Sequence, residues 1–115
     1  MNSNFENLDV WKKSCRLSVR LWQLLKNSDE YWLKEQMLRS ALSIPSNIAE
    51  VCERNSKAEF KRFINIAKGS AAELRTQMYI AIETGVLKKE SMGKCVEELK
   101  VITKMLQALV NSLNR

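Results

Sequence analysis

The last quarter of the chain repeats an apolar residue at every seventh position, and this repeat constrains the fold more than any other feature. The repeat consists of Met92, Leu99, Leu106 and Leu113, and the apolar residues on the face between them are Val96, Ile102, Leu109 and Val110. A seven-residue spacing keeps apolar side chains on one side of a helix, where other helices must cover them. The spacing therefore predicts a bundle helix over residues 88–113.

Earlier parts of the chain also show helical periodicity, in segments separated by turn signals. These segments span about residues 8–26, 30–54 and 57–84. Ser56 and Glu59 form a capping pattern at the start of the third segment. Gly85 suits the left-handed residue that ends this segment, with Val86 placed to fold back onto the last turn.

The number and length of these segments predict the fold class. At 115 residues, the chain is long enough for one core and too short for two of ordinary size. It contains three glycines and one proline, which is far below their usual share and indicates few turns. We therefore predict an all-α, antiparallel up-down-up-down four-helix bundle that forms a single domain over residues 1–115.

The first segment is predicted to bury a broad apolar face. This face contains Leu8, Val10, Trp11, Cys15, Leu17, Leu21, Trp22, Leu24 and Leu25. The three cysteines, Cys15, Cys52 and Cys95, are widely separated and match neither a disulfide framework nor a CxxC metal site. We interpret all three as reduced core residues, because free cysteine is among the most buried residue types.

The only proline, Pro45, lies inside the second segment. The apolar pattern stays in phase across Pro45, which predicts one kinked helix, although the sequence "NIAE" at 47–50 resembles a capping box and would also fit a break. The apolar sector contains Met37, Leu38, Ala41, Leu42, Ile44, Pro45, Ile48, Ala49, Val51 and Cys52. The polar sector contains Gln36, Arg39, Ser40, Ser43, Ser46, Asn47, Glu50, Glu53 and Arg54.

The polar sector of the second segment has two interpretations. It is either a solvated surface or a face that meets another subunit or a ligand. The candidate contact residues for the second interpretation are Arg39, Ser43, Ser46, Asn47 and Glu50.

The residues needed for common catalytic sites are missing from the sequence. Without histidine, the chain has no Ser-His-Asp or Cys-His pair and no zinc site of the usual histidine-containing kinds. It also lacks a nucleotide-binding loop and a nucleophile elbow, so we expect no metal and no cofactor. Glu50, Glu73 and Arg39 would support acid–base chemistry if they were buried together, but paired charges in bundles are more often structural. We expect the protein not to be an enzyme.

The sequence shows no targeting signal for a membrane or for secretion. No apolar run approaches the roughly 20 residues that a helix needs to cross a bilayer. The first residues lack the hydrophobic stretch of a signal peptide. We therefore expect a cytoplasmic protein with no membrane partner.

Basic residues are concentrated on two of the predicted helices. The chain has a net charge of +6 and a pI near 9.4. The first helix carries Lys12, Lys13, Arg16 and Arg20, and the third carries Lys61, Lys68 and Arg75 at seven-residue spacing. Such rows can neutralise phosphates without reading bases, so these seven residues are the candidate nucleic-acid contacts. The alternative is that they form the solvated surface of a bundle.

Three sequence blocks resemble one known family. "LDVWKKS", "SIPSNIAE" and "EFKRFINIAKGSAAELRTQMYIA" resemble the 23S rRNA-intervening sequence protein family, and the resemblance runs from Leu8 to Leu113. It implies an antiparallel four-helix bundle that assembles into ring-shaped homo-oligomers, as pentamers. It also implies a fold similar to the accessory proteins of diversity-generating retroelements, which partner a reverse transcriptase and nucleic acid.

This chain departs from the family pattern at two positions. Val51 replaces a glycine that would favour an early end of the second helix, so we expect that helix to continue for another turn. Arg75 stands where relatives often have an acidic residue, which adds positive charge.

The sequence leads to one preferred function and one alternative. The preferred function is a non-enzymatic homo-oligomer that binds structured RNA or other nucleic acid through its basic helix faces. The alternative is a scaffold or an adapter for a protein such as a reverse transcriptase, without direct nucleic-acid binding. The small-residue stretch Ala67–Ala72 and the aromatic residues Phe5, Tyr31 and Trp32 would fit either contacts between subunits or packing within the monomer.

Overall fold

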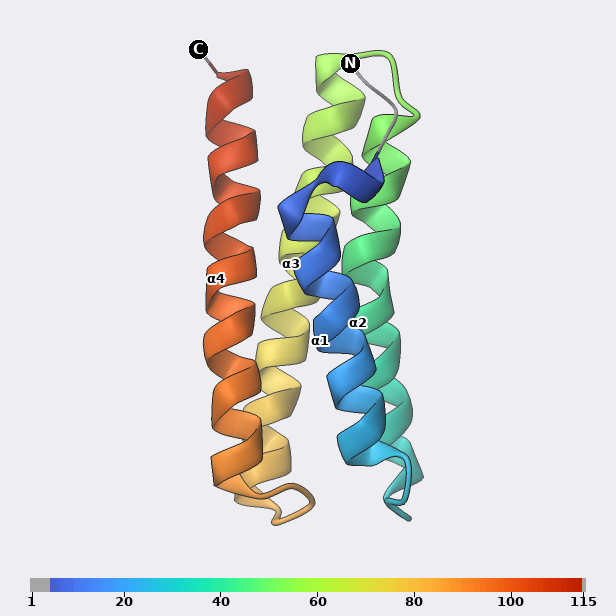
Figure 1. Ribbon diagram of the computed structural model, residues 1–115, viewed down its shortest axis with the longest axis vertical. Helices are drawn as coiled ribbons and strands as arrows, with labels where there is room; N and C mark the ends of the chain where they lie inside the picture. The colour runs from blue at the N-terminus through green and yellow to red at the C-terminus, as the bar shows by residue number, and fades with distance from the viewer. Residues whose placement is uncertain (1–4, 115) are drawn as a thin grey trace.

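The computed structural model describes residues 5–114, and these residues form helices joined by short connections. The elements are a 3-10 helix η1 (Phe5–Asn7) followed by α1 (Asp9–Leu25), α2 (Tyr31–Cys52), α3 (Lys57–Glu83) and α4 (Lys89–Leu113). Consecutive helices run in opposite directions along a rod that measures 43 × 21 × 21 Å (Figure 1). The predicted all-α, up-down-up-down bundle is confirmed.

The four helices occupy the corners of a square. Each helix packs against its neighbour along the chain, and α4 closes the arrangement by packing against α1. In the described part of the chain, no close backbone approach joins α1 to α3 or α2 to α4. Therefore α1 lies diagonally across the bundle from α3, and α2 lies diagonally across from α4.

Helix α2 passes through Pro45 without a break, so the prediction of a single helix is confirmed. The kink itself stays a prediction. The expected extra turn after Val51 is wrong, because α2 ends at Cys52. Ser56 already has extended backbone angles as the N-cap of α3, so the chain must leave the helix before that residue. The Arg54 N–H completes the exit by donating to the Val51 carbonyl at 3.1 Å.

The ends of α3 follow the predicted local chemistry. The hydroxyl oxygen of Ser56 accepts the Glu59 N–H at 3.1 Å and so satisfies a donor that the first turn of the helix leaves free. Gly85 has a φ of 75°, the left-handed conformation that glycine adopts without strain. Val86 then packs against the core as expected.

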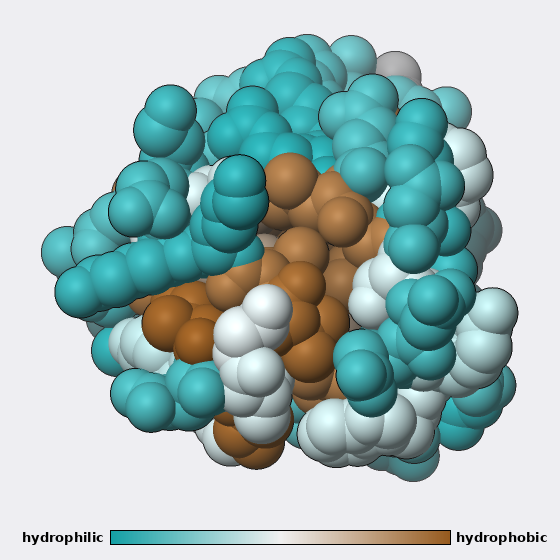
Figure 2. All heavy atoms as spheres, turned by 90° about the horizontal axis from the view of Figure 1, so that it is seen from below, coloured by the Kyte–Doolittle hydropathy of each residue, from teal (hydrophilic) through white to brown (hydrophobic). Residues whose placement is uncertain are grey.

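The predicted apolar seam of α4 forms part of the core. Met92, Leu99 and Leu106 are fully buried, whereas Leu113 is only partly buried at the end of the bundle. Viewed from its lower end, the molecule shows apolar residues at its centre and hydrophilic residues around much of the rim (Figure 2). The core therefore extends through the bundle to the lower end.

Several residues depart from the predicted apolar and polar faces. Trp22 and Leu42 were expected on apolar faces but are 53% and 58% exposed, and Cys15 is only half-buried. Conversely, Ser40 was assigned to the polar sector and is buried. The reason is that a helix in a square bundle buries a narrow stripe, and residues at the edge of a broad apolar sector fall outside it. Cys52 is buried as predicted, and so is Cys95.

The core makes a stability prediction. Replacing Leu99 with Ala should lower the free energy of unfolding by about 2–5 kcal/mol, because the side chain is fully buried and its removal leaves a cavity. Chemical denaturation followed by circular dichroism measures this change. The matched control is Val101→Ala on the same helix, where the side chain is 46% exposed and a loss below about 0.5 kcal/mol is expected. Equal losses in the two variants would contradict the described packing.

Candidate nucleic-acid interface

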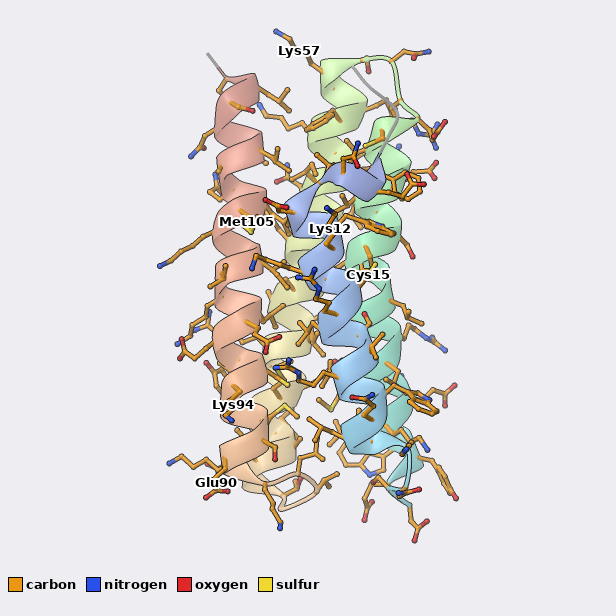
Figure 3. The ribbon with its side chains drawn as sticks, in the orientation of Figure 1. Lys12, Cys15, Lys57, Glu90, Lys94 and Met105 are labelled. Atoms are coloured by element: carbon orange, nitrogen blue, oxygen red, sulfur yellow. The ribbon has the colours of Figure 1, made fainter. Side chains whose placement is uncertain are left out.

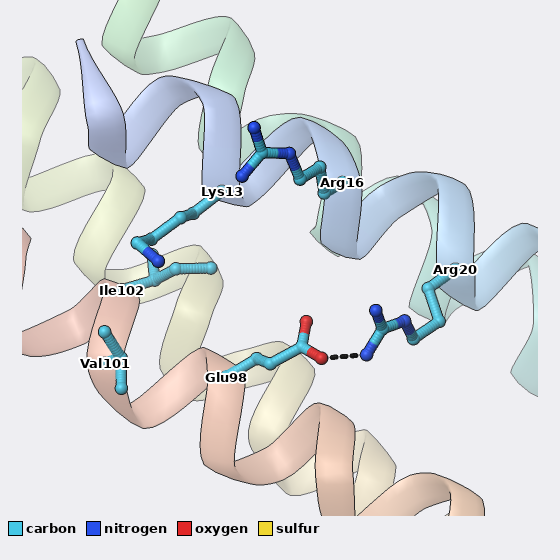
Figure 4. A pocket seen from close by; sticks show the side chains of 6 residues that line it. All are labelled: Lys13, Arg16, Arg20, Glu98, Val101 and Ile102. Atoms are coloured by element: carbon cyan, nitrogen blue, oxygen red, sulfur yellow. Dashed lines mark hydrogen bonds and ion pairs between the residues drawn. The ribbon is translucent and has the colours of Figure 1, made fainter.

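Basic side chains line a groove between α1 and α4. Lys13, Arg16 and Arg20 of α1 face Glu98, Val101 and Ile102 of α4 around a space of about 250 Å³ (Figure 4). The guanidinium of Arg20 donates to the carboxylate of Glu98, as the dashed line in Figure 4 shows. The groove therefore has cations along one wall and apolar groups beside a single carboxylate on the other.

The charges in this groove are not balanced. Glu98 is the one acidic residue in the lining, and it pairs with Arg20. Within residues 5–114, neither Lys13 nor Arg16 forms an ion pair with a carboxylate. Two cationic groups therefore remain available to an anionic ligand.

The second predicted basic row lies on the side of α3 that faces α4. The ammonium of Lys68 donates to the side-chain oxygen of Gln107 on α4. Lys61 and Arg75 share the same helical position at seven-residue spacing and so lie along the same edge. The Arg75 Nε–H donates to the hydroxyl of Tyr79 at 3.0 Å. This row has no carboxylate partner among the described ion pairs.

The fold places the two basic rows on opposite flanks of α4. Because α1 and α3 are diagonal, the rows do not adjoin each other, but each borders the same helix. Between them, the outward face of α4 carries the exposed residues Lys94 and Lys104 together with the exposed carboxylates of Glu90 and Glu97. Figure 3 labels Lys94 on α4 and Lys12 on α1. Lys12 does not line the groove; it lies four residues before Arg16, on the adjoining outer surface of α1.

Sequence reasoning missed the two lysines of α4. The sequence shows basic rows within α1 and within α3, but it does not show that α4 lies between those two helices. Lys94 and Lys104 lie between the positions of the apolar repeat that forms the buried seam of α4. Their positions in the repeat therefore predict that both side chains are exposed.

The predicted contact face of α2 is partly used inside the monomer. The Ser43 and Ser70 hydroxyls are hydrogen-bonded at 2.8 Å, which joins α2 to α3. Asn47 donates from Nδ2 to the Ser43 carbonyl at 2.7 Å and to the Ser43 hydroxyl at 3.0 Å. Both Ser43 and Asn47 are half-buried, so their polar groups are already engaged before any partner binds.

The other three residues of that predicted face are more accessible. Ser46 is exposed, Arg39 pairs with Glu35 at 3.6 Å, and Glu50 pairs with Arg54. These ion pairs lie between residues four apart on one helix surface, where each stabilises a helix by only about 0.3–0.5 kcal/mol. The structure therefore divides the five predicted residues between an internal seam and an open surface.

The condition for acid–base chemistry is not met in the described structure. Glu73 and Arg39 are exposed, and Glu50 is half-exposed in its own ion pair. No group of three or more cysteine, aspartate or glutamate residues in residues 5–114 could hold a metal ion. In that same part of the chain, no helix has the length and apolar character to cross a bilayer.

The thiols are held in a poorly reactive form. Burial raises the pKa of Cys95 to about 11, with the nearby charge of Glu98 adding to the effect. Burial also raises the pKa values of Cys15 and Cys52. Because the thiolate is the reactive species, all three groups are weak nucleophiles near neutral pH.

The family model for the 23S rRNA-intervening sequence protein matches residues 6–108. The chain belongs to this family. A crystal structure at 1.70 Å of a protein of unknown function from the S23 ribosomal protein family of Bacteroides thetaiotaomicron has a TM-score of 0.83 to this chain. The two are 28% identical, and the match covers 88% of this chain and 97% of that one. No curated protein matches the chain.

The motifs that carry the family resemblance meet in space. The "SIPSNIAE" block lies on α2 and the "GSAAE" block lies on α3, and the Ser43–Ser70 bond joins them. A second bond runs from the Ser40 hydroxyl to the Glu73 carboxylate at 3.4 Å. In this family member, the two blocks therefore form one polar seam between adjacent helices.

The buried Cys95 thiol predicts a pH dependence of stability. An unfolded cysteine loses its proton near pH 9, whereas folded Cys95 keeps it until about pH 11. The free energy of unfolding should therefore fall as the pH rises from 9 to 11, and this thiol should account for about 2 kcal/mol of the fall. In Cys95→Ala the decline should be smaller by that amount in denaturation curves recorded at each pH. Parallel declines in parent and variant would refute the assignment.

Proposed function

We propose that this protein is a non-enzymatic, cytoplasmic homo-oligomer that binds structured RNA or other nucleic acid through α4 and its two basic flanks. The observation that carries the proposal is the α1–α4 groove, where Lys13 and Arg16 have no carboxylate partner among the described residues. Cations without internal partners can release counterions from a phosphate backbone, which is the main source of non-specific affinity.

The shape of the surface suits a backbone ligand. Helix α4 has 25 residues and is therefore about 37 Å long, close to one turn of duplex. Lysine and arginine side chains on either side of it would contact phosphates as point charges. This mode of binding selects for shape and charge rather than for base sequence.

Assembly would strengthen such binding. Each copy offers only a few unpaired cations, so a single surface is expected to bind weakly. Several copies held together turn later contacts into intramolecular ones and raise the overall affinity without new chemistry. The resemblance to ring-forming relatives makes a pentamer the expected assembly.

A second candidate is a scaffold or an adapter that binds a protein such as a reverse transcriptase without touching nucleic acid. The exposed apolar residues Val19, Trp22 and Leu42 favour this candidate, because apolar side chains on a surface suit protein contacts. Salt separates the two candidates. Nucleic-acid binding weakens steeply as salt rises, whereas an apolar contact does not.

Reversing the groove charges tests the preferred function. Lys13→Glu combined with Arg16→Glu should weaken binding to a labelled RNA hairpin at least about tenfold, measured by fluorescence anisotropy at low salt. The slope of log affinity against log salt should become shallower by about 1–2, since each lost phosphate contact accounts for about 0.7–0.9.

The matched control carries the same change in net charge elsewhere. Lys26→Glu combined with Lys34→Glu alters two lysines around the connection between α1 and α2, and neither of them lines the groove or belongs to the basic row on α3. This control should bind within about twofold of the parent. Equal losses in both variants would mean that only net charge matters, and undetectable binding by the parent at low salt would remove the proposal.

A further inference from the structure

An apolar groove lies open between α1 and α2. It is lined by Ser18, Val19, Trp22, Leu38 and Leu42 and has a volume of about 290 Å³. Val19, Trp22 and Leu42 are each more than half exposed. Neighbouring apolar residues on the surface of a protein mark a contact site more often than scattered ones do.

We propose that a second copy of this chain covers the groove with the outer face formed by its α2 and α3. The proposal rests on the homo-oligomer that is part of the proposed function, and it assigns the two surfaces that meet. The first surface is the apolar groove just described, here called the α1–α2 groove. The second is called the α2–α3 face and comprises exposed residues of α3 on its side next to α2, namely Ile66, Gly69, Glu73, Thr76 and Ile80.

The α2–α3 face provides apolar contacts around an open position. Ile66 and Ile80 are each 40% exposed, although both are large apolar residues. Between them, a Cβ added at Gly69 would meet no atom within 4 Å. The interior of α3 therefore contains a glycine that packing within the monomer does not require. The space beside it suits a protruding side chain such as Trp22 of another copy.

Charge favours this pairing over contact between two α1 helices. The outer surface of α1 carries Lys12 and Lys26, so packing α1 against α1 would bring like charges together. The outer surface of α3 carries the carboxylates of Glu73 and Glu83. Its one nearby cation, Arg62, is already paired with Glu59 at 3.7 Å. Unlike charges across an interface increase the association rate and exclude the alternative arrangement.

The square arrangement of helices lets one copy use both surfaces at once. The groove and the face occupy adjacent sides of the bundle and share α2, so each can hold a different neighbour. A contact between two different surfaces repeats from copy to copy and forms a ring when the rotation closes. Because α4 is diagonal to α2, the proposed nucleic-acid surface would remain outside the contact.

Two variants, each with one of the two surfaces disrupted, test whether these surfaces meet. Trp22→Glu with Leu42→Glu disables the groove, and Gly69→Arg disables the face at a position where the new side chain meets open space. Light scattering after size exclusion should give the 13.3 kDa monomer mass for each variant alone, at concentrations where the parent assembles. An equimolar mixture should give twice that mass, because each variant keeps the surface that the other has lost.

Other masses would overturn the proposal. A groove variant that keeps the mass of the parent, a mixture that stays monomeric, or a parent that is itself monomeric would each contradict it. Circular dichroism checks that both variants remain helical. The control Val101→Glu alters an exposed apolar residue outside both surfaces and should keep the mass of the parent. RNA binding by the monomeric groove variant, measured at low salt, tests the basic surface independently of assembly. It therefore shows whether the proposed contact between copies or the proposed nucleic-acid surface is wrong.

Discussion

The structure depends on the burial of one narrow apolar stripe from each of four helices. The stripe of α4, with Met92, Leu99 and Leu106 fully buried, meets the stripes of its neighbours in a single core. This constraint sets which helices are adjacent and which are diagonal. As a result, the basic rows of α1 and α3 border α4 from two sides, while α2 lies across the bundle from that surface. The proposed division of the surface follows from this arrangement.

The α2–α3 pair is held together differently from the rest of the core. Small polar side chains bridge it, notably Ser43 and Ser70, and Asn47 adds bonds back to Ser43. Buried hydroxyl groups need such partners because an unpaired polar group away from water is destabilising. This pairing gives Ser43 and Ser70, one from each of the two blocks, a structural role in this chain. It also explains why part of the predicted contact face of α2 is not free.

Periodicity predicted the four helices, and local chemistry predicted the Ser56 cap and the Gly85 turn, because both depend on residues close in sequence. The exposure of Trp22 and Leu42 was not predictable in this way. It depends on where the neighbouring helices lie, and a wheel drawn for one helix does not contain that information. The relation between the Lys13 row and the Lys68 row also required the order of helices in space. Similarly, the end of α2 at Cys52 was set by the cap of the next helix.

The central claim is that the side of the bundle around α4 binds nucleic acid while α2 does not. The most direct test uses the protein without substitutions. The extent of acetylation at each lysine is measured by mass spectrometry with and without an RNA hairpin. RNA should protect Lys13, Lys68 and Lys104, and it should leave Lys34 on α2 unchanged. Equal protection of Lys34, or no protection at the three lysines around α4, would contradict the account.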